Sequence, residues 1–363
     1  MPILPRGRGG TIPFVRAAIP RVINAVAPIR ICDNGGWTDT WFARHGKVFN
    51  IAVSPLAEVQ IEARERAEGE PAVVIHAENF GHRYAPSPDR EGWDRHPLLE
   101  AAVRRAALAR DRAVQITIFS EAPPGASTGT SAAVAVALVG ALDRLNGGDL
   151  DHHQAAYAAH SIEVDILGRQ SGIQDQLCSA HGGISYIEMT DYPQASVTRL
   201  EVGDATAWDL ERRLALVYLG RSHDSSEAHQ RVIRELEEAG SECRQLNDLR
   251  RAAERSRDAV AAGDLEALGR AMIENTEAQG RLCSDLIGPD AQRVIAIARE
   301  HGARGWKVNG AGGEGGSLTL LASPRAHEKR AMIQAIEAEN PLFRRIPIQL
   351  SREGLRVWER ASD

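Results

Sequence analysis

The sequence predicts an α+β protein with two domains. Short stretches in which Val and Ile alternate with polar residues, as at 47–53 and 57–65, are typical of half-buried strands, and longer helical stretches lie among them. The chain has 363 residues, a length that suggests two hydrophobic cores at roughly 150 residues per domain. We therefore expect an N-terminal arm over residues 1–26, a first domain over 27–205 and a second over 206–363.

Charge and composition exclude several classes of protein. With 43 Lys and Arg against 49 Asp and Glu the net charge is −6, whereas a protein that follows nucleic-acid phosphates normally has a net basic surface. The longest apolar stretch, residues 132–142, is too short to cross a bilayer. Four dispersed cysteines without a CxxC pair favour a reduced, cytoplasmic protein. We expect small-molecule partners, no nucleic acid and no membrane, in a monomer or a homodimer.

Strand and helix patterns follow one another along the whole chain. After the two strands named above, the first half is expected to contain strands at 72–76, 113–120, 184–189 and 196–202 and helices at 97–109, 130–145 and 151–167. The second half is expected to contain a polar turn at 204–211, a strand at 214–219, helices at 225–262 and 264–282, and then a helix and two strands around a glycine-rich loop.

The stretch APPGASTGTSAA, residues 122–133, is a loop of small and hydroxyl-bearing residues between a strand and a long helix. Accessible backbone N–H groups and the positive end of the helix dipole make such a loop suitable for a phosphate. It is not a Walker A loop, because the GK[ST] ending and any nearby lysine are absent. An ordinary turn with Ser and Thr caps is the alternative.

Two further stretches are rich in glycine. In RICDNGGWTDT, residues 30–40, carboxylates and an amide beside an indole ring suit a polyhydroxylated ligand, although an Asn-Gly turn between strands explains the same residues equally well. In KVNGAGGEGGS, residues 307–317, five of the seven positions 310–316 are glycine. Such density allows close approach of the backbone to a ligand, and a flexible hairpin loop is the alternative.

Taken together and in this order, the three stretches resemble the three motifs of the GHMP kinases, the family of galactokinase, homoserine kinase, mevalonate kinase and phosphomevalonate kinase. The resemblance spans about residues 27–358, and EVDILGRQSGIQDQ at 163–176 is similar to the segment that carries the catalytic aspartate of the family. Within the family, the heptose 7-phosphate kinases and the fucokinases look closest, through GGWTD at 35–39, QDQ at 174–176, GGISYIE at 182–188, LGRSHDSS at 219–226 and EGLRVW at 353–358.

The resemblance implies a fold and a reaction. The N-terminal half should be like domain 2 of ribosomal protein S5, the C-terminal half should be ferredoxin-like, and the active site should lie in the cleft between them. The expected phosphoryl donor is ATP with Mg²⁺, and the expected acceptor is a sugar hydroxyl. The resemblance favours the anomeric C1 hydroxyl of a heptose, with or without a 7-phosphate, or of a fucose-like aldose.

The resemblance also assigns roles to individual residues. Asp175 matches the residue that takes or orients the proton of the attacking hydroxyl, and Arg30 matches a permanent positive charge in the first motif. Glu163 and Ser131 match the carboxylate and the hydroxyl that bind Mg²⁺. The expected substrate-binding residues are Asp33, Gly36, Trp37, Thr38, Asp39 and Gly183. The expected nucleotide-binding residues are Pro124, Gly125, Ala126, Ser127, Thr128, Gly129, Thr130, Ser131, Gly312 and Gly313.

Several residues depart from the motifs of the family. Ser127, Thr128 and Thr130 stand where Gly, Leu and Ser are common, and Glu314 stands where glycine is usual. The side chain of Ser127 would alter a loop whose backbone normally passes close to phosphate. Asp33 would repel a second phosphate on the substrate, which leaves open whether the sugar is already phosphorylated.

Two alternatives remain: a non-catalytic protein of the same fold that binds sugar and ATP, and a kinase for a non-sugar alcohol such as mevalonate or homoserine. The lysine content bears on the mechanism in each case. The chain has only Lys47, Lys307 and Lys329, and neither the first motif nor the phosphate loop contains one. Backbone amides, Mg²⁺ and Arg30 must therefore supply the positive charge, and Lys307 is the lysine to mutate.

Overall fold

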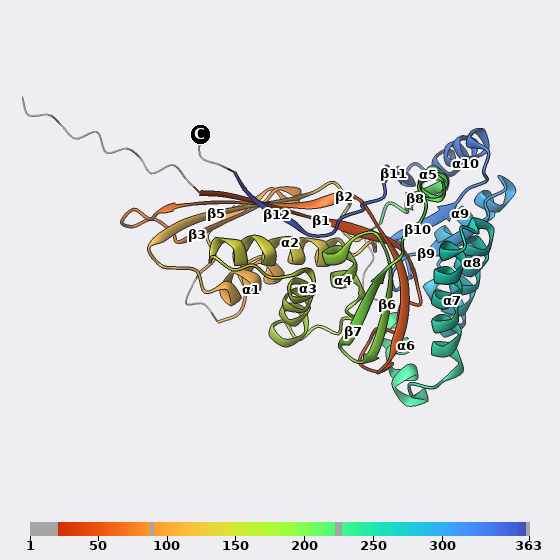
Figure 1. The fold of residues 1–363 in the computed structure, drawn as a ribbon, viewed down its shortest axis with the longest axis horizontal. Helices are drawn as coiled ribbons and strands as arrows, with labels where there is room; N and C mark the ends of the chain where they lie inside the picture. Colours follow the sequence, from red (N-terminus) through yellow and green to blue (C-terminus); the bar gives the residue numbers. More distant parts are fainter. Residues whose placement is uncertain (1–20, 88–90, 222–226, 361–363) are drawn as a thin grey trace, which may run out of the picture.

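The computed structural model describes residues 21–87, 91–221 and 227–360, whose strands form two separate sheets. The larger sheet has the strand order β12-β1-β2-β5-β3-β4, and β6 and β7 extend it from β2. Its strands are β1 (Arg21–Asn34), β2 (Gly46–Glu65), β3 (Val73–Ala77), β4 (His82–Tyr84), β5 (Arg112–Ser120), β6 (Ile184–Asp191), β7 (Gln194–Arg199) and β12 (Arg356–Arg360). Its helices, which lie along one side of the sheet in Figure 1, are α1 (Pro97–Ala106), α2 (Thr130–Leu145), α3 (His152–Ser161) and α4 (Gln174–His181).

The long strand β2 joins two parts of this sheet. Its first residues pair with β6, from Gly46 opposite Met189 onwards, and its last residues pair with β5, up to Glu65 opposite Arg112. The two strands expected at 47–53 and 57–65 are therefore one strand. Pro55 interrupts the alternation of apolar and polar residues, but the backbone stays extended because β1 pairs with both parts.

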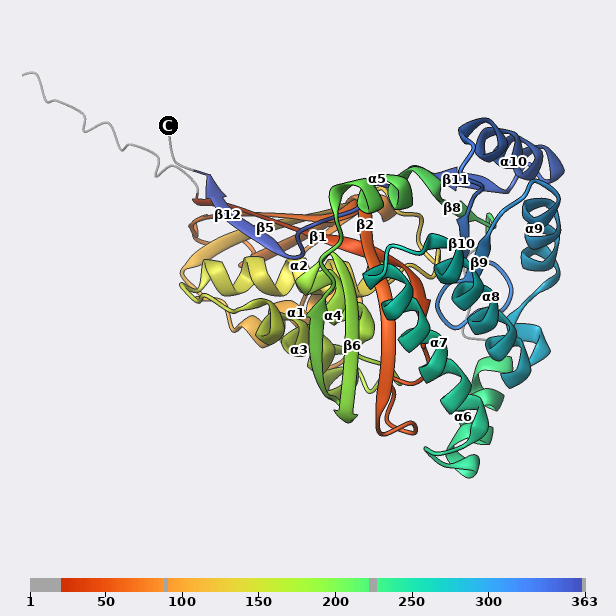
Figure 2. The ribbon, with the colours of Figure 1, turned by 45° about the vertical axis from the view of Figure 1, so that its right-hand side comes forward.

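The smaller sheet is antiparallel, with the strand order β11-β8-β10-β9. Its strands are β8 (Leu214–Tyr218), β9 (Gly305–Val308), β10 (Ser317–Leu321) and β11 (Arg344–Ile346). The helices of this half are α5 (Asp204–Arg213), α6 (Glu227–Ala239), α7 (Arg244–Ala261), α8 (Leu265–Leu282), α9 (Pro289–Glu300) and α10 (Ala326–Glu339). Buried apolar residues of α9 and α10 pack on this sheet. Helix α8 contacts β9 of this sheet, and α7 contacts β2 of the larger one (Figure 2). The predicted α+β fold in two halves is confirmed.

The two ends of the described chain meet in the larger sheet. Strand β12 pairs antiparallel with β1, from Arg356 opposite Val26 to Arg360 opposite Val22 (Figure 1). Residues 21–26, which the sequence assigned to an N-terminal arm, therefore belong to a strand, and the last strand of the chain contributes to the N-terminal half. The domain limits at 27, 205 and 206 remain a prediction.

Three local predictions are wrong. Residues 204–211, expected to be a polar turn, lie in α5, which buries Leu210 and bonds the guanidinium of Arg213 to the carbonyl of Ala322. The helix expected at 225–262 is two helices, because Gly240 adopts a left-handed conformation with φ of 80° after α6; residues 225 and 226 lie outside the described part. The helix expected at 151–167 changes after Ser161 to the π-helix η2 (Ile162–Ile166).

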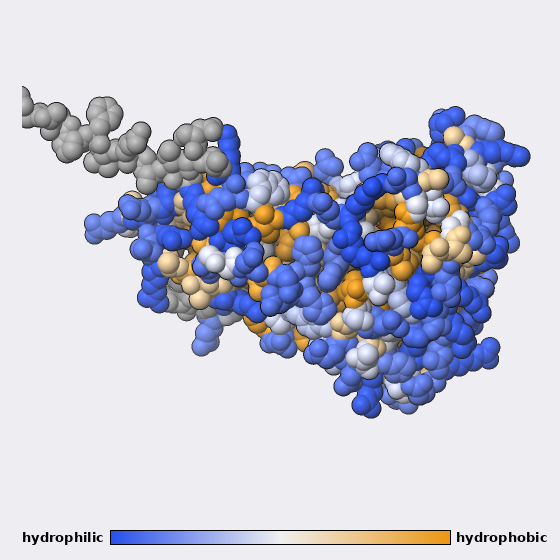
Figure 3. All heavy atoms as spheres, viewed as in Figure 1, coloured by the Kyte–Doolittle hydropathy of each residue, from blue (hydrophilic) through white to orange (hydrophobic). Residues whose placement is uncertain are grey.

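The surface agrees with the charged composition. Hydrophilic residues cover most of the face in Figure 3, and hydrophobic residues are visible mainly around α2 and over β8 and β10. In the described part of the chain, no helix is both long and apolar enough to span a membrane.

Candidate active site

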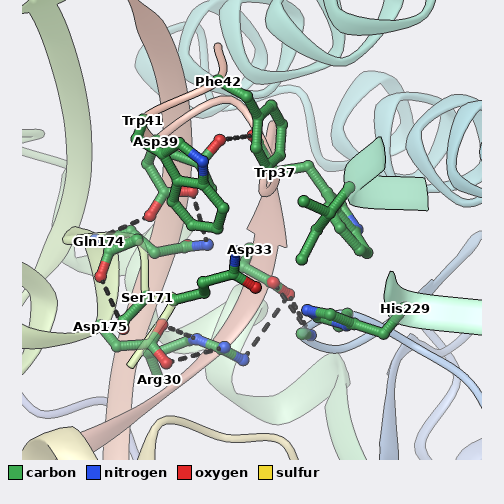
Figure 4. A pocket seen from close by; sticks show the side chains of 16 residues that line it. Arg30, Asp33, Trp37, Asp39, Trp41, Phe42, Ser171, Gln174, Asp175 and His229 are labelled. Atoms are coloured by element: carbon green, nitrogen blue, oxygen red, sulfur yellow. Dashed lines mark hydrogen bonds and ion pairs between the residues drawn. The ribbon is translucent and has the colours of Figure 1, made fainter. Parts of the chain in front are cut away.

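Arg30 and Asp175 meet at the junction of two cavities. Arg30 lies near the end of β1, and Asp175 lies in the first turn of α4, a short helix that the sequence did not predict. The Arg30 guanidinium donates from Nε to Oδ1 of Asp175 at 2.8 Å and from Nη2 to Oδ2 at 3.2 Å, as Figure 4 shows. Its Nη1 donates to the carbonyl of Ser127 at 2.5 Å. Burial opposes the charge of Arg30, but Asp175 and Asp33 raise its pKa above the ordinary value.

The larger cavity, of about 570 Å³, lies along the phosphate loop and the start of α2. Eight of the expected nucleotide-binding residues line it, namely Pro124, Gly125, Ala126, Ser127, Thr128, Gly129, Thr130 and Ser131. Gly125, Ser127 and Gly129 all have positive φ angles, which turn the loop sharply before the helix. Asn79, Phe80 and His96 also line this cavity, although the sequence did not predict them as site residues.

Gly129 lets the loop pass close to the pair of Arg30 and Asp175. A Cβ atom at Gly129 would lie 3.2 Å from Oδ2 of Asp175 and 3.3 Å from Cγ of Arg30. The helix N-terminus, with its free N–H groups, therefore opens directly beside the charged pair.

The third motif touches the phosphate loop, but through other glycines than expected. Gly310 and Ala311 line both cavities, whereas Gly312 and Gly313 line neither. The N–H of Gly313 donates to the carbonyl of Leu286, so that part of the loop packs away from the cavities. The side chain of Ser127, which departs from the family motif, is accommodated by glycine in the third motif. A Cβ at Gly316 would lie only 2.7 Å from Ser127 Oγ, so a larger residue at 316 would collide with it.

The smaller cavity, of about 200 Å³, lies on the other side of Asp175. Of the expected substrate-binding residues, Asp33, Trp37 and Asp39 line it, together with Arg30 and Asp175 (Figure 4). The sequence missed its other polar and aromatic lining residues, which are Thr40, Trp41, Phe42, Gln170, Ser171, Gln174 and His229. Gln174 was part of the quoted QDQ stretch, while His229 comes from α6, distant in the sequence. His223 of the LGRSHDSS stretch lies outside the described residues.

Three expected substrate residues do not line the smaller cavity. Thr38 is buried and donates from Oγ1 to the carbonyl of Gly35, so it holds the turn of the first motif together. Gly36 contacts Asp33 and not the cavity: a Cβ at Gly36 would lie 3.1 Å from Oδ2 of Asp33. Gly183 lies between β2 and the C-terminal segment, where its N–H donates to the carbonyl of Ser351.

Asp39 is a buried carboxylate held by neutral groups. It accepts the backbone N–H of Gln174 at 3.0 Å and the side-chain amide of Gln174 at 3.4 Å. Burial is the main cause that raises the pKa of Asp39 to about 6, and the nearby Asp175 acts in the same direction. The Gln174 N–H opposes both effects. Trp37 lines the same cavity, with its ring centroid 4.7 Å from that of His229.

The two expected Mg²⁺ ligands differ in their surroundings. Ser131 lines the larger cavity at the start of α2. Glu163 is buried in η2, where it accepts the side-chain amide of Gln176 at 2.9 Å and the hydroxyl of Ser171 at 3.2 Å. Burial raises the pKa of Glu163, and Arg169 opposes this effect. Among the described residues no group of three or more His, Cys, Asp or Glu could hold a metal ion. One carboxylate and one hydroxyl are donors that Mg²⁺ accepts when phosphate and water supply its other ligands.

Comparison with known proteins identifies the class of protein that this fold and site define. Residues 98–183 match the GHMP kinases N terminal domain, and residues 249–338 match the GHMP kinases C terminal domain. The chain is 32% identical over 267 residues to the mevalonate kinase of Thermococcus onnurineus, covering 71% of this chain and 72% of that one. It is 30% identical over 260 residues to the mevalonate kinase of Thermococcus sibiricus, covering 68% and 70%. The chain belongs to the GHMP kinase family.

Solved structures support the same fold. A D-glycero-D-manno-heptose 1-phosphate kinase from Bacteriodes thetaiotaomicron superposes with a TM-score of 0.71 at 21% identity, over 94% of this chain and all of that one. This likeness shows the fold alone. Membership of the family makes the chain a phosphotransferase with an alcohol group as acceptor, and ATP is the phosphoryl donor of such kinases.

Proposed function

We propose that the chain is a sugar kinase, which transfers the γ-phosphoryl group of MgATP to a hydroxyl of an uncharged, polyhydroxylated acceptor. The charge balance of the smaller cavity carries this proposal. Arg30 pairs with Asp175 and lies 3.8 Å from Asp33, and Lys307 pairs with Asp33, so these four charges neutralise one another. Asp39 adds a further buried carboxylate, which is bonded by neutral amides.

Hydrogen-bonding groups in the cavity suit the same acceptor. Oε1 of Gln174 and Nε1 of Trp37 are buried and have no hydrogen-bond partner among the described residues. A buried polar atom without a partner is costly, and sugar hydroxyls can both donate to Gln174 and Asp39 and accept from Trp37. Mevalonate and homoserine carry a carboxylate, whose charge would lie close to Asp39 and be repelled.

The reaction would take place where the two cavities meet. Asp175 would accept or orient the proton of the attacking hydroxyl, while Arg30 and the N–H groups at the start of α2 would stabilise charge on the transferring phosphoryl group. Ser131 and Glu163 are proposed as protein ligands of Mg²⁺, which when bound neutralises charge on the phosphates. The anomeric C1 hydroxyl is proposed as the acceptor because GGWTD and QDQ resemble the heptose kinases and fucokinases.

An acceptor without a second phosphate fits the described cavity better. Among the cavity-lining residues that the structure describes, the cationic candidates are Arg30 and His229, and Arg30 is already paired with Asp175. A free heptose or fucose-like aldose would need no further cation.

A panel of acceptors tests the proposal. ADP release would be measured with MgATP and, in turn, neutral aldoses, a 7-phosphorylated heptose, mevalonate and homoserine. Turnover with at least one aldose and none with mevalonate is expected. Turnover with mevalonate or homoserine and with no sugar would overturn the sugar assignment.

Mevalonate is the second candidate acceptor, because the curated relatives at 30–32% identity are mevalonate kinases. A non-catalytic protein that binds sugar and ATP is a third candidate, which the presence of Asp175, Glu163 and Ser131 together disfavours, since binding needs no base. Calorimetry that detects sugar and ATP binding without any ADP formation would favour it.

A further inference from the structure

Lys307 is a fully buried lysine at the base of the third motif. It lies on β9, its side chain is 1% exposed, and it is distinct from the cavity-lining residues. Its Nζ contacts Oδ1 of Asp33 and Oε1 of Gln279, each at 3.2 Å, and donates to the carbonyl of Val308. An ammonium group taken out of water is costly unless it is paired, so the contacts with Asp33, Gln279 and Val308 must offset that cost.

Asp33 connects this lysine to both halves of the site. Its carboxylate accepts the N–H of Gly310 at 2.9 Å, which orients the start of the third-motif loop. Nη1 of Arg30 lies 3.8 Å from Oδ1 of the same carboxylate, beyond hydrogen-bond distance. Asp33 is thus paired more closely with Lys307 than with Arg30.

The four residues form one row of alternating charges, which we call the buried charge row: Lys307, Asp33, Arg30 and Asp175. Figure 4 shows its last three members, with Arg30 between the two carboxylates. Arg30 bonds Asp175 through two nitrogens but only approaches Asp33. Asp33 and Asp175 therefore compete for the guanidinium of Arg30, and the outcome depends on whether another cation neutralises Asp33.

We propose that Lys307 is a positioning residue for phosphoryl transfer: by neutralising Asp33, it leaves Arg30 directed at Asp175 and at the transferring phosphoryl group. The proposal rests on the roles given above to Arg30 and Asp175, and it assigns Asp33 to positioning rather than to sugar binding. Without the ammonium, Arg30 needs to move only about 1 Å to form a charge-assisted hydrogen bond with Asp33. Its contact with Asp175 would lengthen accordingly.

A purely structural role is the competing explanation. Lys307 comes from the smaller sheet and Asp33 from the larger one, so their pair also ties the two halves together. Loss of that tie would lower stability, yet it would leave kcat of the folded protein unchanged.

Kinetics of two variants separate these explanations. In Lys307→Met, kcat is expected to fall by at least about 10²-fold with the KM for ATP little changed, the size seen when one electrostatic group of a preorganised site is lost. Lys329→Met is the matched control, because Lys329 is half-buried and bonds the carbonyls of Arg212 and Leu214, away from Asp33 and Arg30. It should keep its kcat. A Lys307→Met kcat within threefold of the wild-type value would overturn the proposal.

The double variant Asp33→Asn with Lys307→Met tests the charge argument directly. Removing both charges removes the competitor for Arg30, so kcat should recover by at least about tenfold over Lys307→Met. A merely structural tie would be lost equally in both variants. A double variant no more active than Lys307→Met, with both proteins folded by circular dichroism, would contradict the proposal.

Lysine side-chain NMR provides a test that needs no acceptor and no stable Lys307 variant. Protein labelled at lysine Cε and Nζ should show three side-chain signals, which Lys47→Arg and Lys329→Met assign. The substitution Asp175→Asn should shift the Lys307 signal through the buried charge row and leave the other two in place. An unmoved Lys307 signal would overturn the inference. Because no sugar is present, this result is independent of whether the sugar assignment holds.

Discussion

Asp39 and Asp175 line one cavity, but their carboxylates are held in different ways. Asp175 receives two hydrogen bonds from a guanidinium, whereas Asp39 receives two from neutral amides. The first arrangement pairs a carboxylate with a permanent positive charge, and the second leaves a buried carboxylate whose pKa is raised to about 6. These two environments lead to different predictions.

Asp175→Asn should lower kcat by at least about 10²-fold while MgATP still binds, because a positioned base contributes about 10²- to 10⁴-fold. The measurement is ADP release at saturating substrates, with nucleotide affinity by calorimetry. Asp191→Asn, at an exposed position at the end of β6, is the control and should leave kcat unchanged. A kcat within threefold of wild type in Asp175→Asn would show that the base is misassigned.

Asp39 should make both stability and acceptor binding depend on pH. Its pKa is about 6 in the folded protein against an ordinary value of 3.8, so the folded state binds the proton more tightly than the unfolded chain. The free energy of unfolding should therefore fall by about 3 kcal/mol as pH rises from about 4 to above 6. If the proposed sugar hydroxyls donate to ionised Asp39, the KM for the acceptor should rise as pH falls below about 6.

Asp39→Asn provides the check on both effects. It should raise the free energy of unfolding at pH 7.5, measured with urea, and raise the acceptor KM while removing its dependence on pH between about 5 and 7. If the acidic rise in KM persists in Asp39→Asn, another group titrates there.

Glu163→Gln should weaken the response to metal. We expect the Mg²⁺ concentration at half-maximal rate to rise at least about tenfold, since loss of a charged ligand removes part of the attraction for a hard cation. Binding of metal-free ATP, followed by calorimetry, should not change. An unaltered Mg²⁺ dependence would show that Glu163 is not a metal ligand.

At the scale of the elements, the phosphate loop and α2 position the site by backbone shape. The loop turns through three positive φ angles before α2 starts, and Gly129 brings that start against Asp175. The sequence predicted the loop and the helix, because small residues followed by an Ala- and Val-rich stretch are a local pattern. It could not predict α4, whose eight residues have little periodicity and are held by packing under α2 and α3.

Gly129→Ala should lower kcat for a steric reason beyond backbone strain. Gly129 and Gly147 both have positive φ angles, but a Cβ at Gly129 meets Asp175 at 3.2 Å, whereas one at Gly147 meets nothing within 4 Å. Both variants should lose about 1 kcal/mol of stability, and only Gly129→Ala should lose most of its kcat. Equal kcat values in the two variants would refute the steric argument.

At the scale of the whole molecule, distant parts of the chain complete each half. The larger sheet, which carries Arg30, has β12 from the far end of the described chain at its edge. Helix α6 places His229 in the lining of the smaller cavity. The site is therefore built from both halves, and its integrity depends on contacts that have no local pattern in the sequence.

Leu355→Ala should test how far the C-terminal segment stabilises the N-terminal half. Leu355 is buried against Gly140 of α2, so the cavity left behind should cost about 2–4 kcal/mol in the free energy of unfolding. On β12, Glu359 pairs with Arg21 at the surface, and Glu359→Ala should cost less than about 1 kcal/mol. Urea unfolding measures both. Equal losses of stability in the two variants would show that the buried contact of Leu355 contributes no more than the surface ion pair of Glu359.

The amino-acid sequence was sufficient for the fold class, the order of the motifs and the residues of the phosphate loop, because each depends on short stretches with a strong local pattern. The family resemblance pointed to Arg30 and Asp175 as separate residues. Only the tertiary structure showed that Arg30 pairs with Asp175, that Asp33 faces Lys307, and that Gly310 rather than Gly312 reaches the cavities. It also showed that Gln174 and His229 line the smaller cavity. These depend on contacts between residues more than a hundred positions apart, or on the direction in which a side chain points. Spacing along the chain carries no information on either.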